Sequence, residues 1–316
     1  VSKQKLDVCW LRDIETLKVK TRVFPNSKAG HQALLEWLAA QTGDACPAIT
    51  VVMEATGVYH EALAYTLYEA GVDVVVSNPY QVRQFAQSLG KRSKTDKKDS
   101  IVLARFLASR EHQRWAPEPE AVRHLRALLS RLQALDNDIQ RERNHQEKAE
   151  QQRSSAKVLE SIETMLRALE AERKRLAKDI DDHIGGHPEL KADCDLLKSI
   201  PGIGPVLSVE LTAALRSREF KSAGQAAAFF GLVPIMHTSG TSICTRPKLS
   251  KAGGQKLCSK LYMGTVVAAR HNPSVVKHYQ RLLARGKARM SALCAAMRKL
   301  LQIAYGVLKH QTPYDP

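Results

Sequence analysis

The first third of the chain alternates between two spacings of apolar residues, and this predicts an α/β domain. The runs Leu6–Leu11 and Leu17–Phe24 have strand-like patterns and indicate two strands, and Pro25 and Asn26 end the second run. Two short β-branched runs, Ile49–Met53 and Val72–Val76, indicate two buried strands. The segments with helical spacing are Gly30–Ala40, Tyr59–Ala70, the residues from Tyr80, and Lys94–Ser109. Strands and helices in this order are typical of an α/β fold.

The middle third of the chain has apolar residues that step by three and four positions. They run over Leu125–Ile139 and Ile162–Ile180, with a polar break at residues 154–155. This spacing predicts an antiparallel helical hairpin or coiled coil. A linker is expected before it at Ala116–Pro119, and a helix breaker after it at Gly185–Pro188. We interpret this near-neutral segment as a spacer or an assembly element.

The last third of the chain is rich in helical patterns that glycines separate. The predicted helices are Val206–Leu215, Ala223–Phe230, Lys256–Arg270 and Ser291–Leu308. The sequence SIPGIG at Ser199–Gly204 lies between two apolar helical stretches, which predicts a helix-hairpin-helix-like segment. The residues Val233–Gly254 are expected to form a loop.

Length and composition exclude several classes of protein. With 316 residues, 44% of them hydrophobic and 25% charged, the chain is long enough for about two folded domains. It has no apolar run of the roughly 18 residues that a membrane span requires, and we expect a cytoplasmic protein with no membrane partner. The six cysteines lie far apart without a CxxC pair, which argues against a disulfide framework and structural zinc.

The net charge of +16 is concentrated near the end of the chain. Residues 193–316 have 18 basic and five acidic side chains, whereas residues 111–192 have 15 basic and 16 acidic ones. A charge that served only solubility would be spread more evenly, so this distribution favours a nucleic-acid surface in the last third over a merely solvated face.

Three carboxylates are candidates for a metal site. Asp96 and Asp99 stand three residues apart in a predicted helix, so that they share one face and repel each other unless a cation lies between them. Glu54 ends a buried strand, a position from which a carboxylate can point into a cleft. Carboxylates are the ligands of Mg²⁺ in phosphodiester chemistry. The alternative is that Asp96 and Asp99 pair with neighbouring lysines on a solvated helix.

Two further segments could contact nucleic acid. Gly202 and Gly204 would let the backbone approach a phosphate at the start of a helix, although an ordinary turn between helices explains them equally well. Ser239 precedes a glycine in a hydroxyl-rich segment and could attack a phosphodiester, with cations following it in the sequence. Such segments are common and no general base lies nearby in sequence, so the residues alone leave Ser239 open.

These pieces together resemble one family over nearly the whole chain. It is the family of DEDD-type insertion-sequence transposases with a C-terminal serine domain, which are described as bridge-RNA-guided recombinases. The resemblance rests on SKQKLDV from Ser2, EATGVYHE from Glu54, KTDKKD from Lys94, IPGIG from Ile200, FFGLVP from Phe229, SG at Ser239, and LSKAGGQKL from Leu249. Each motif is weak alone, whereas their order and spacing are specific.

The resemblance implies a fold and a set of site residues. The N-terminal domain is expected to be RNase H-like, similar to Holliday-junction resolvases, with four acids that hold Mg²⁺. Three of the four match Glu54, Asp96 and Asp99, and the nucleophilic serine matches Ser239. The first aspartate of the family would fall just ahead of Val1. Asp7 aligns with a later position and does not take that role, so we expect a truncated first strand and an incomplete metal site in the sequence as given.

We therefore predict an insertion-sequence transposase with an RNase H-like domain at residues 1–112, a helical coiled-coil hairpin at 113–192 and a mainly α serine transposase domain at 193–316. The expected partners are DNA at the element ends and target, a guide RNA, and further copies of the chain in a dimer or tetramer. The residues expected to contact nucleic acid are Lys91, Arg92, Lys94, Gly202, Gly204, Arg246, Lys248, Lys251 and Lys256. The alternatives are a Mg²⁺-dependent junction nuclease and an inactive, truncated copy that only binds nucleic acid.

Overall fold

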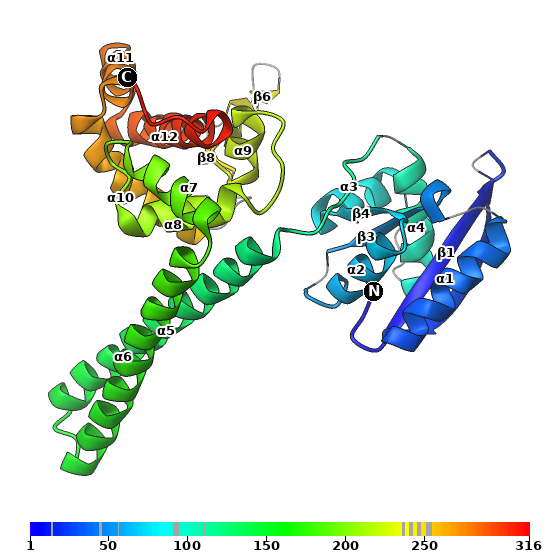
Figure 1. Ribbon diagram of the computed structural model, residues 1–316, viewed down its shortest axis with the longest axis horizontal. Helices are drawn as coiled ribbons and strands as arrows, with labels where there is room; N and C mark the ends of the chain where they lie inside the picture. The colour runs from blue at the N-terminus through cyan, green and yellow to red at the C-terminus, as the bar shows by residue number, and fades with distance from the viewer. Residues whose placement is uncertain are drawn as a thin grey trace. The chain divides into compact units, whose positions relative to one another are not determined.

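The computed structural model describes residues 1–13, 15–43, 46–55, 57–90, 95–109, 111–235, 238–239, 243–244, 248–250 and 255–316. Of some of these, Ser239 and Lys256 among them, only the backbone is described. The described chain is mostly helical, with small two-stranded sheets. It divides into two compact units, Val1–Pro117 and Glu118–Pro316, and the division falls within the expected linker (Figure 1).

The first unit has strands and helices where the apolar spacing predicts them. Its strands are β1 (Lys5–Asp13), β2 (Lys18–Pro25), β3 (Thr50–Glu54) and β4 (Asp73–Ser77), and its helices are α1 (Lys28–Thr42), α2 (Glu61–Glu69), α3 (Pro79–Ser88) and α4 (Asp96–Ala108), with a short 3-10 helix, η1 (Cys46–Ala48). β1 and β2 pair antiparallel, whereas β3 and β4 pair parallel and are joined by α2. The described strands of the first unit thus form two separate sheets.

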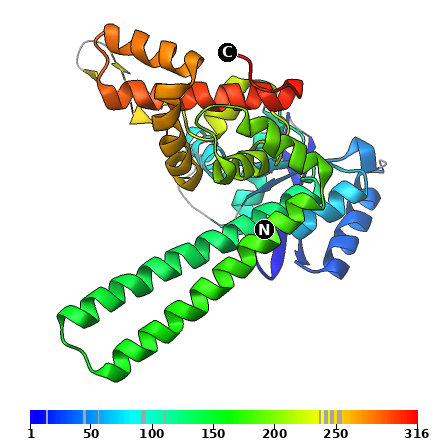
Figure 2. The ribbon, with the colours of Figure 1, turned by 60° about the vertical axis from the view of Figure 1, so that its left-hand side comes forward.

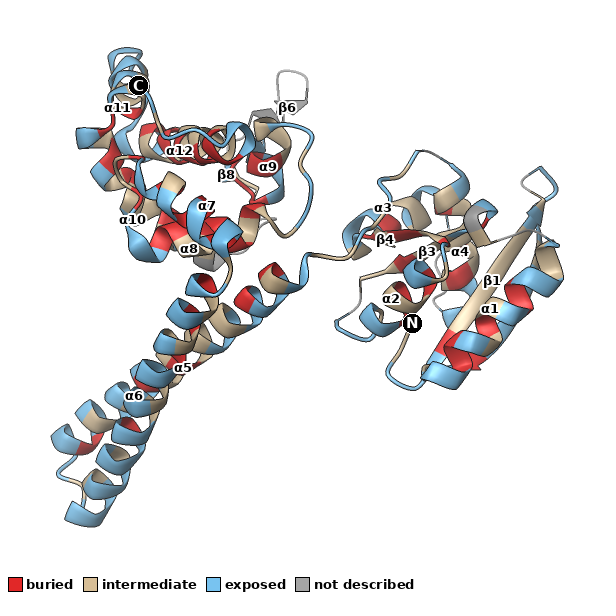
Figure 3. Cartoon of the chain, viewed as in Figure 1, coloured by how far each residue is buried: buried red, intermediate tan, exposed pale blue. Residues whose placement is uncertain are grey.

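One apolar core holds most of the first unit together. Its members come from the strands, α1 and α2, and the most buried include Leu6, Leu34, Met53 and Leu67 (Figure 3). α4 contacts both β1 and β3, and it buries Phe106 against α3 in a smaller cluster. α4 therefore links the two sheets and brings its first turn to them.

The second unit begins with a helical hairpin. α5 (Glu120–Gln151) and α6 (Ala156–Gly185) run side by side, as Figure 2 shows. Most of their length is exposed, and ion pairs such as Arg143 to Glu170 (2.8 Å) cross between them. Near the base of the hairpin, Leu125 and Ile180 join a cluster of buried residues from the following helices.

The rest of the second unit packs around its last helix. The remaining helices are α7 (Pro188–Lys198), α8 (Pro205–Leu215), α9 (Ala223–Phe229), α10 (Gln255–His271), α11 (Pro273–Ala284) and α12 (Arg289–His310). α12 buries eight side chains along its length and lies beside α9, α10 and α11. None of the described helices combines the length and apolar character that crossing a membrane requires.

The prediction that Val233–Gly254 form a loop is partly wrong. The structure describes four two-residue strands there, β5 (Pro234–Ile235), β6 (Thr238–Ser239), β7 (Ile243–Cys244) and β8 (Lys248–Leu249). β5 pairs with β8, and β6 pairs with β7, both antiparallel. Two residues are too few to show an alternation of apolar and polar side chains, so the sequence pattern could not reveal these strands.

Candidate functional site

Glu54 lies where the parallel strands β3 and β4 end. The register pairs Glu54 with Ser77, and the amide of Ala55 donates to the Ser77 carbonyl at 3.1 Å. Glu54 is half-buried. The Ser77 hydroxyl is buried and has no hydrogen-bond partner among the described residues. The carboxyl ends of parallel strands are where α/β proteins commonly bind ligands. The end of β3 and β4 therefore lies where a ligand could bind, and Oγ of Ser77 is a buried polar atom that such a ligand could pair with.

Asp96 and Asp99 lie in the first turn of α4. Thr95 caps this helix, because its hydroxyl accepts from the Lys98 amide at 3.3 Å. The positive end of the helix dipole favours carboxylates there, so the two acids stabilise the start of α4 whether or not they bind a metal ion. The side chain of Asp96 is 65% exposed, whereas Asp99 is half-buried.

Lys5 connects α4 to β1, and the sequence analysis missed it. Its Nζ lies 2.7 Å from Oδ2 of Asp96 and 3.2 Å from Oδ2 of Asp7. Hydrogen bonds to Asp96 first, and then to Asp7, raise the pKa of Lys5. Lys5 and Asp7 share one face of β1 because they stand two residues apart, a spacing that was available as a signal. Of the predicted acids, Asp96 therefore has a cationic partner from another element.

The predicted acids have the right chemistry for Mg²⁺ but do not complete a site. Carboxylate oxygens are the ligands that this ion prefers, and α4, which carries two of the acids, contacts the strand that carries Glu54. Within the described ranges, however, no three His, Cys, Asp or Glu side chains gather closely enough to hold a metal ion. The assignment of Glu54, Asp96 and Asp99 to a metal site thus stays a prediction.

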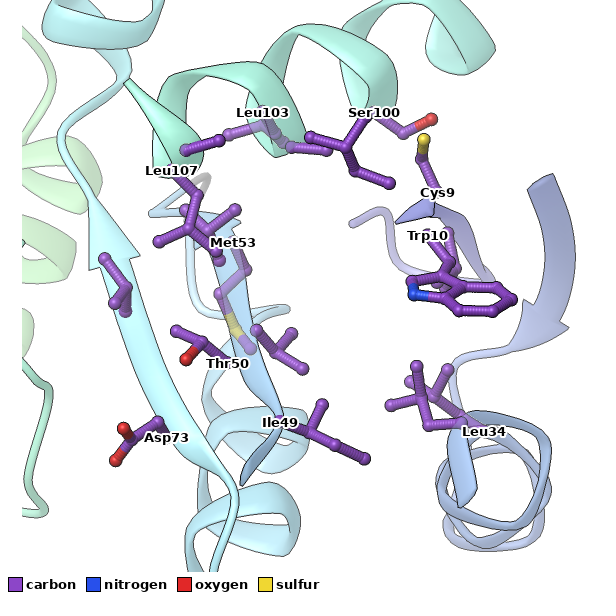
Figure 4. A pocket seen from close by; sticks show the side chains of 18 of the residues that line it. Cys9, Trp10, Leu34, Ile49, Thr50, Met53, Asp73, Ser100, Leu103 and Leu107 are labelled. Carbon is purple, nitrogen blue, oxygen red and sulfur yellow. The ribbon is translucent and has the colours of Figure 1, made fainter. Parts of the chain in front are cut away.

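A cleft of about 740 Å³ lies between β1 on one side and β3 and β4 on the other (Figure 4). Side chains of α4, such as Ser100 and Leu103, line it together with Leu34 of α1 and Trp10 of β1. Among the described strands, β1 pairs with β2 alone and β3 with β4 alone. Two strands with unused hydrogen-bonding edges therefore line the same space.

Ser239 is the last residue of β6. Its backbone pairs antiparallel with Ile243 of β7. The Ser239 side chain lies outside the described part, as do Lys91, Arg92, Lys94, Arg246, Lys251 and the side chain of Lys256. Lys248 is exposed on β8. The structure thus places the backbone of Ser239 in a two-stranded pair, and its role as nucleophile stays a prediction.

The two glycines of IPGIG have different surroundings. Gly202 has φ +103°, and a Cβ added there would lie 2.6 Å from Cβ of Ala268 and 2.7 Å from the carbonyl oxygen of Gly264, both in α10. This glycine allows the turn to pack against α10, which supports the alternative of a structural turn. Gly204 is exposed before α8 and has open space beside it. Of the two, Gly204 is the one that a phosphate could approach.

Known proteins resemble this chain over its whole length. A DEDD transposase model of the IS110 type, described as transposase, matches residues 1–152, and a model described as transposase IS116/IS110/IS902 family matches residues 194–280. The pilin gene-inverting proteins of Moraxella bovis and Moraxella lacunata are each 31% identical over all of this chain and 96% of their own length. A probable family 20 transposase of Pseudomonas aeruginosa is 27% identical over 85% of this chain and 87% of its own.

The chain belongs to the IS110 family of transposases. Members of this family act on DNA, so DNA is the substrate class and transposition or DNA recombination the type of reaction. In this IS110-family transposase, Glu54, Asp96 and Asp99 lie in the segment matched by the first model, and Ser239 lies in that matched by the second. The acids and the serine therefore lie in segments that two different family models match.

Proposed function

We propose that this transposase is a site-specific recombinase that cuts and rejoins DNA at element ends and target, guided by RNA, with Ser239 as nucleophile. The observation that carries the proposal is the similarity over the full chain to proteins named for inverting a pilin gene. Inverting a gene requires strands to be cut and rejoined at two defined sites. A covalent protein–DNA intermediate suits such a reaction because it conserves the energy of the phosphodiester.

The serine step is a transesterification. Oγ of Ser239 attacks the scissile phosphorus and loses its proton to a base. The bond from phosphorus to one DNA strand breaks, which leaves a hydroxyl on that strand and a phosphoserine ester on the protein. Attack of a strand hydroxyl on this ester reverses the step and releases the serine. The match of Ser239 to the nucleophilic serine of the family motif, in the segment matched by the second transposase model, supports this role.

The carboxylates Glu54, Asp96 and Asp99 would hold Mg²⁺ at the scissile phosphate. The ion would supply electrostatic stabilisation of the charge that develops there. The position of Glu54 at a strand end and of both aspartates in one helical turn supports this assignment. Lys5 pairs with both Asp96 and Asp7, so a cation held by Asp96 would compete with this ion pair.

The domain at residues 1–112 would have an RNase H-like sheet whose first strand lies in the cleft between β1 and β3. The unused edges of these strands support this, because an inserted strand could pair with both. Val1 is among the residues that line this cleft. The aspartate that the resemblance implies ahead of Val1 would belong to this strand and complete the ligands.

The remaining parts would assemble the complex. We assign the region 113–192, with its exposed helical hairpin, to the pairing of copies in a dimer or tetramer, as a coiled coil. The region 193–316 would carry the serine and bind the backbones of DNA and guide RNA, which its excess of basic side chains supports.

The test is a search for a covalent protein–DNA adduct on denaturing gels. The chain is incubated with Mg²⁺, DNA spanning an element junction and the RNA encoded beside the element, with and without residues added ahead of Val1 that include an aspartate. We expect an adduct that Ser239→Ala abolishes and that Asp99→Asn reduces by at least about a hundredfold. Ser291→Ala removes an exposed hydroxyl from the first turn of α12 and serves as the control, with the adduct retained.

The other outcomes separate the alternatives. Cleaved strands without adduct, unaffected by Ser239→Ala, would identify a nuclease in which water attacks. Binding without cleavage, in both forms of the chain, would identify a protein that only binds nucleic acid. An adduct that appears only with the added residues would show that the first strand and its aspartate are needed.

A further inference from the structure

The segment from Phe220 to Tyr314 has no acidic residue. Its 95 residues include 15 lysines and arginines, so the excess charge of the last third lies almost entirely here. Among the described residues of this segment, Lys260 of α10 has an ion pair, with Glu210 of α8. No such pair is described for the cations of α11 and α12. Their charge is therefore uncompensated within the described structure.

α11 and α12 form a helical hairpin with one apolar and one basic side. Val275 of α11 and Leu300 of α12 are fully buried in the core of the second unit. The exposed basic side chains of the hairpin and its turn are Lys277, Arg281, Arg285, Lys287, Arg289 and Lys309. Because packing against the core fixes both helices, these cations have a defined arrangement in space.

One of these cations, Arg281, contacts His278 of α11. Nη2 of Arg281 lies 3.1 Å from Nδ1 of His278. A guanidinium can only donate, so Nδ1 accepts this hydrogen bond and lacks a proton. Burial first, and then the charges of Arg281, Lys299 and Lys287, lower the pKa of His278. These cations come from α11, from the turn and from α12, so the cluster spans the hairpin.

We propose that this α11–α12 basic cluster, formed by Arg281, Lys287 and Lys299 around His278, binds the phosphodiester backbone of the nucleic acid on which the protein acts. The proposal rests on the proposed function for the class of its ligand. Cations that spread over two helices without a carboxylate partner match a polymer that carries one negative charge per phosphate, and each contact releases a counterion. Backbone contacts of this kind position the nucleic acid and do not read its sequence.

The test compares a charge-removing variant with a matched control. Arg281→Gln, Lys287→Gln and Lys299→Gln are combined in one variant. The control combines Lys157→Gln, Lys174→Gln and Lys178→Gln, which remove the same charge from exposed positions of α6. Circular dichroism establishes that both variants are folded. Binding to a short DNA duplex and to an RNA stem of mixed sequence is measured from low to physiological salt.

We expect the cluster variant to bind at least about tenfold more weakly, and the slope of log affinity against log salt to fall by about 3. The control should keep the slope of the parent chain. Loss with one probe alone would identify whether DNA or RNA is the ligand of the cluster. Equal slopes for the cluster variant and the control would overturn the proposal. It would also be overturned if polyglutamate displaced the bound probe as effectively, per negative charge, as unlabelled nucleic acid does.

A second readout follows His278 in the parent chain by NMR, with His278→Gln to assign the signal. A bound phosphate offsets the neighbouring cations, so the pKa of His278 should rise when nucleic acid is added. Binding with no change in this pKa would contradict a contact at the cluster. A parent chain that binds neither probe would instead contradict the proposed function, so the two failures are distinguishable.

Discussion

At the scale of single residues, Asp193 shows how the second unit uses a buried charge. Its side chain is 5% exposed and makes a two-pronged ion pair with Arg216, with distances of 2.6 and 2.7 Å. Gln311, which follows α12, donates to Oδ1 of Asp193 at 3.0 Å. The carboxylate thus joins α7, the end of α8 and the end of α12, and its hydrogen bond raises the pKa of Arg216.

Replacing Asp193 by alanine should destabilise the second unit strongly. Arg216 would lose its counter-charge and Gln311 an acceptor, and breaking a buried pair on one side costs about 3–5 kcal/mol. We expect about 3 kcal/mol in the free energy of unfolding, because the Arg216 side chain remains 39% exposed. Urea unfolding followed by circular dichroism measures it. Glu172→Ala, which breaks an exposed pair with Arg175, should change little, and equal effects of the two substitutions would contradict a special role for Asp193.

The candidate site was predictable where local sequence determines it. Glu54 ends an apolar strand, of which the structure buries Met53 alone, and Asp96 and Asp99 begin a capped helix. Both features can be read from a few neighbouring residues. Lys5 could not be connected with Asp96 in the same way, because 91 residues separate them and the fold alone brings them together. The metal site depends on such long-range placement, which explains why three suitable carboxylates do not by themselves define it.

At the scale of elements, the contact between the IPGIG turn and α10 depends on two glycines. A Cβ added to Gly264 would lie 2.6 Å from the carbonyl oxygen of Gly202 and 2.6 Å from Cδ2 of Leu207. Asn272, directly after α10, caps α11, because its Oδ1 accepts from the amide of Val275, and it also accepts from the hydroxyl of Tyr314. The turn therefore has a packing function whether or not Gly204 contacts a phosphate.

Replacing Gly264 by alanine should lower the stability of the fold, whereas replacing Gly306, another helical glycine, by alanine should raise it. Gly264→Ala forces the turn away from α10, and overpacking of this kind costs about 1–3 kcal/mol. Gly306 lies in α12 with nothing within 4 Å of an added Cβ. Gly306→Ala should gain about 0.5–1 kcal/mol because alanine favours a helix. Thermal unfolding of both variants measures the difference, and a Gly264→Ala chain as stable as Gly306→Ala would refute the close contact.

The elements that the sequence analysis missed are short or lie between stronger patterns. α11 begins with Asn272 as a cap and Pro273 in its first turn, which is a recognisable helix start. It is shorter than α10 and α12, which precede and follow it in the sequence and have longer apolar patterns. The strands β5 to β8 have two residues each and exist through their pairing, which no local pattern shows. Long amphipathic helices such as α5 and α6, by contrast, follow directly from their apolar spacing.

At the scale of the whole molecule, the two units have separate apolar cores and separate optical signals. All three tryptophans, Trp10, Trp37 and Trp115, belong to the first unit and pack in or against its core. Trp115 also makes edge-to-face contacts with Tyr65 and Tyr68 of α2. Most of the long helices belong to the second unit. Tryptophan fluorescence therefore reports on the first unit, and far-ultraviolet circular dichroism mainly on the second.

A substitution in one core should consequently leave the unfolding of the other unit unchanged. Leu261 of α10 is 1% exposed in the core of the second unit, and Leu261→Ala should cost about 2–5 kcal/mol there. We expect the transition seen by circular dichroism to move to lower urea concentration while the transition seen by tryptophan fluorescence stays in place. Leu67→Ala in the first core is the reciprocal variant and should move the fluorescence transition. If either substitution shifts both transitions equally, the units unfold together, and the division at Pro117 would describe geometry without energetic independence.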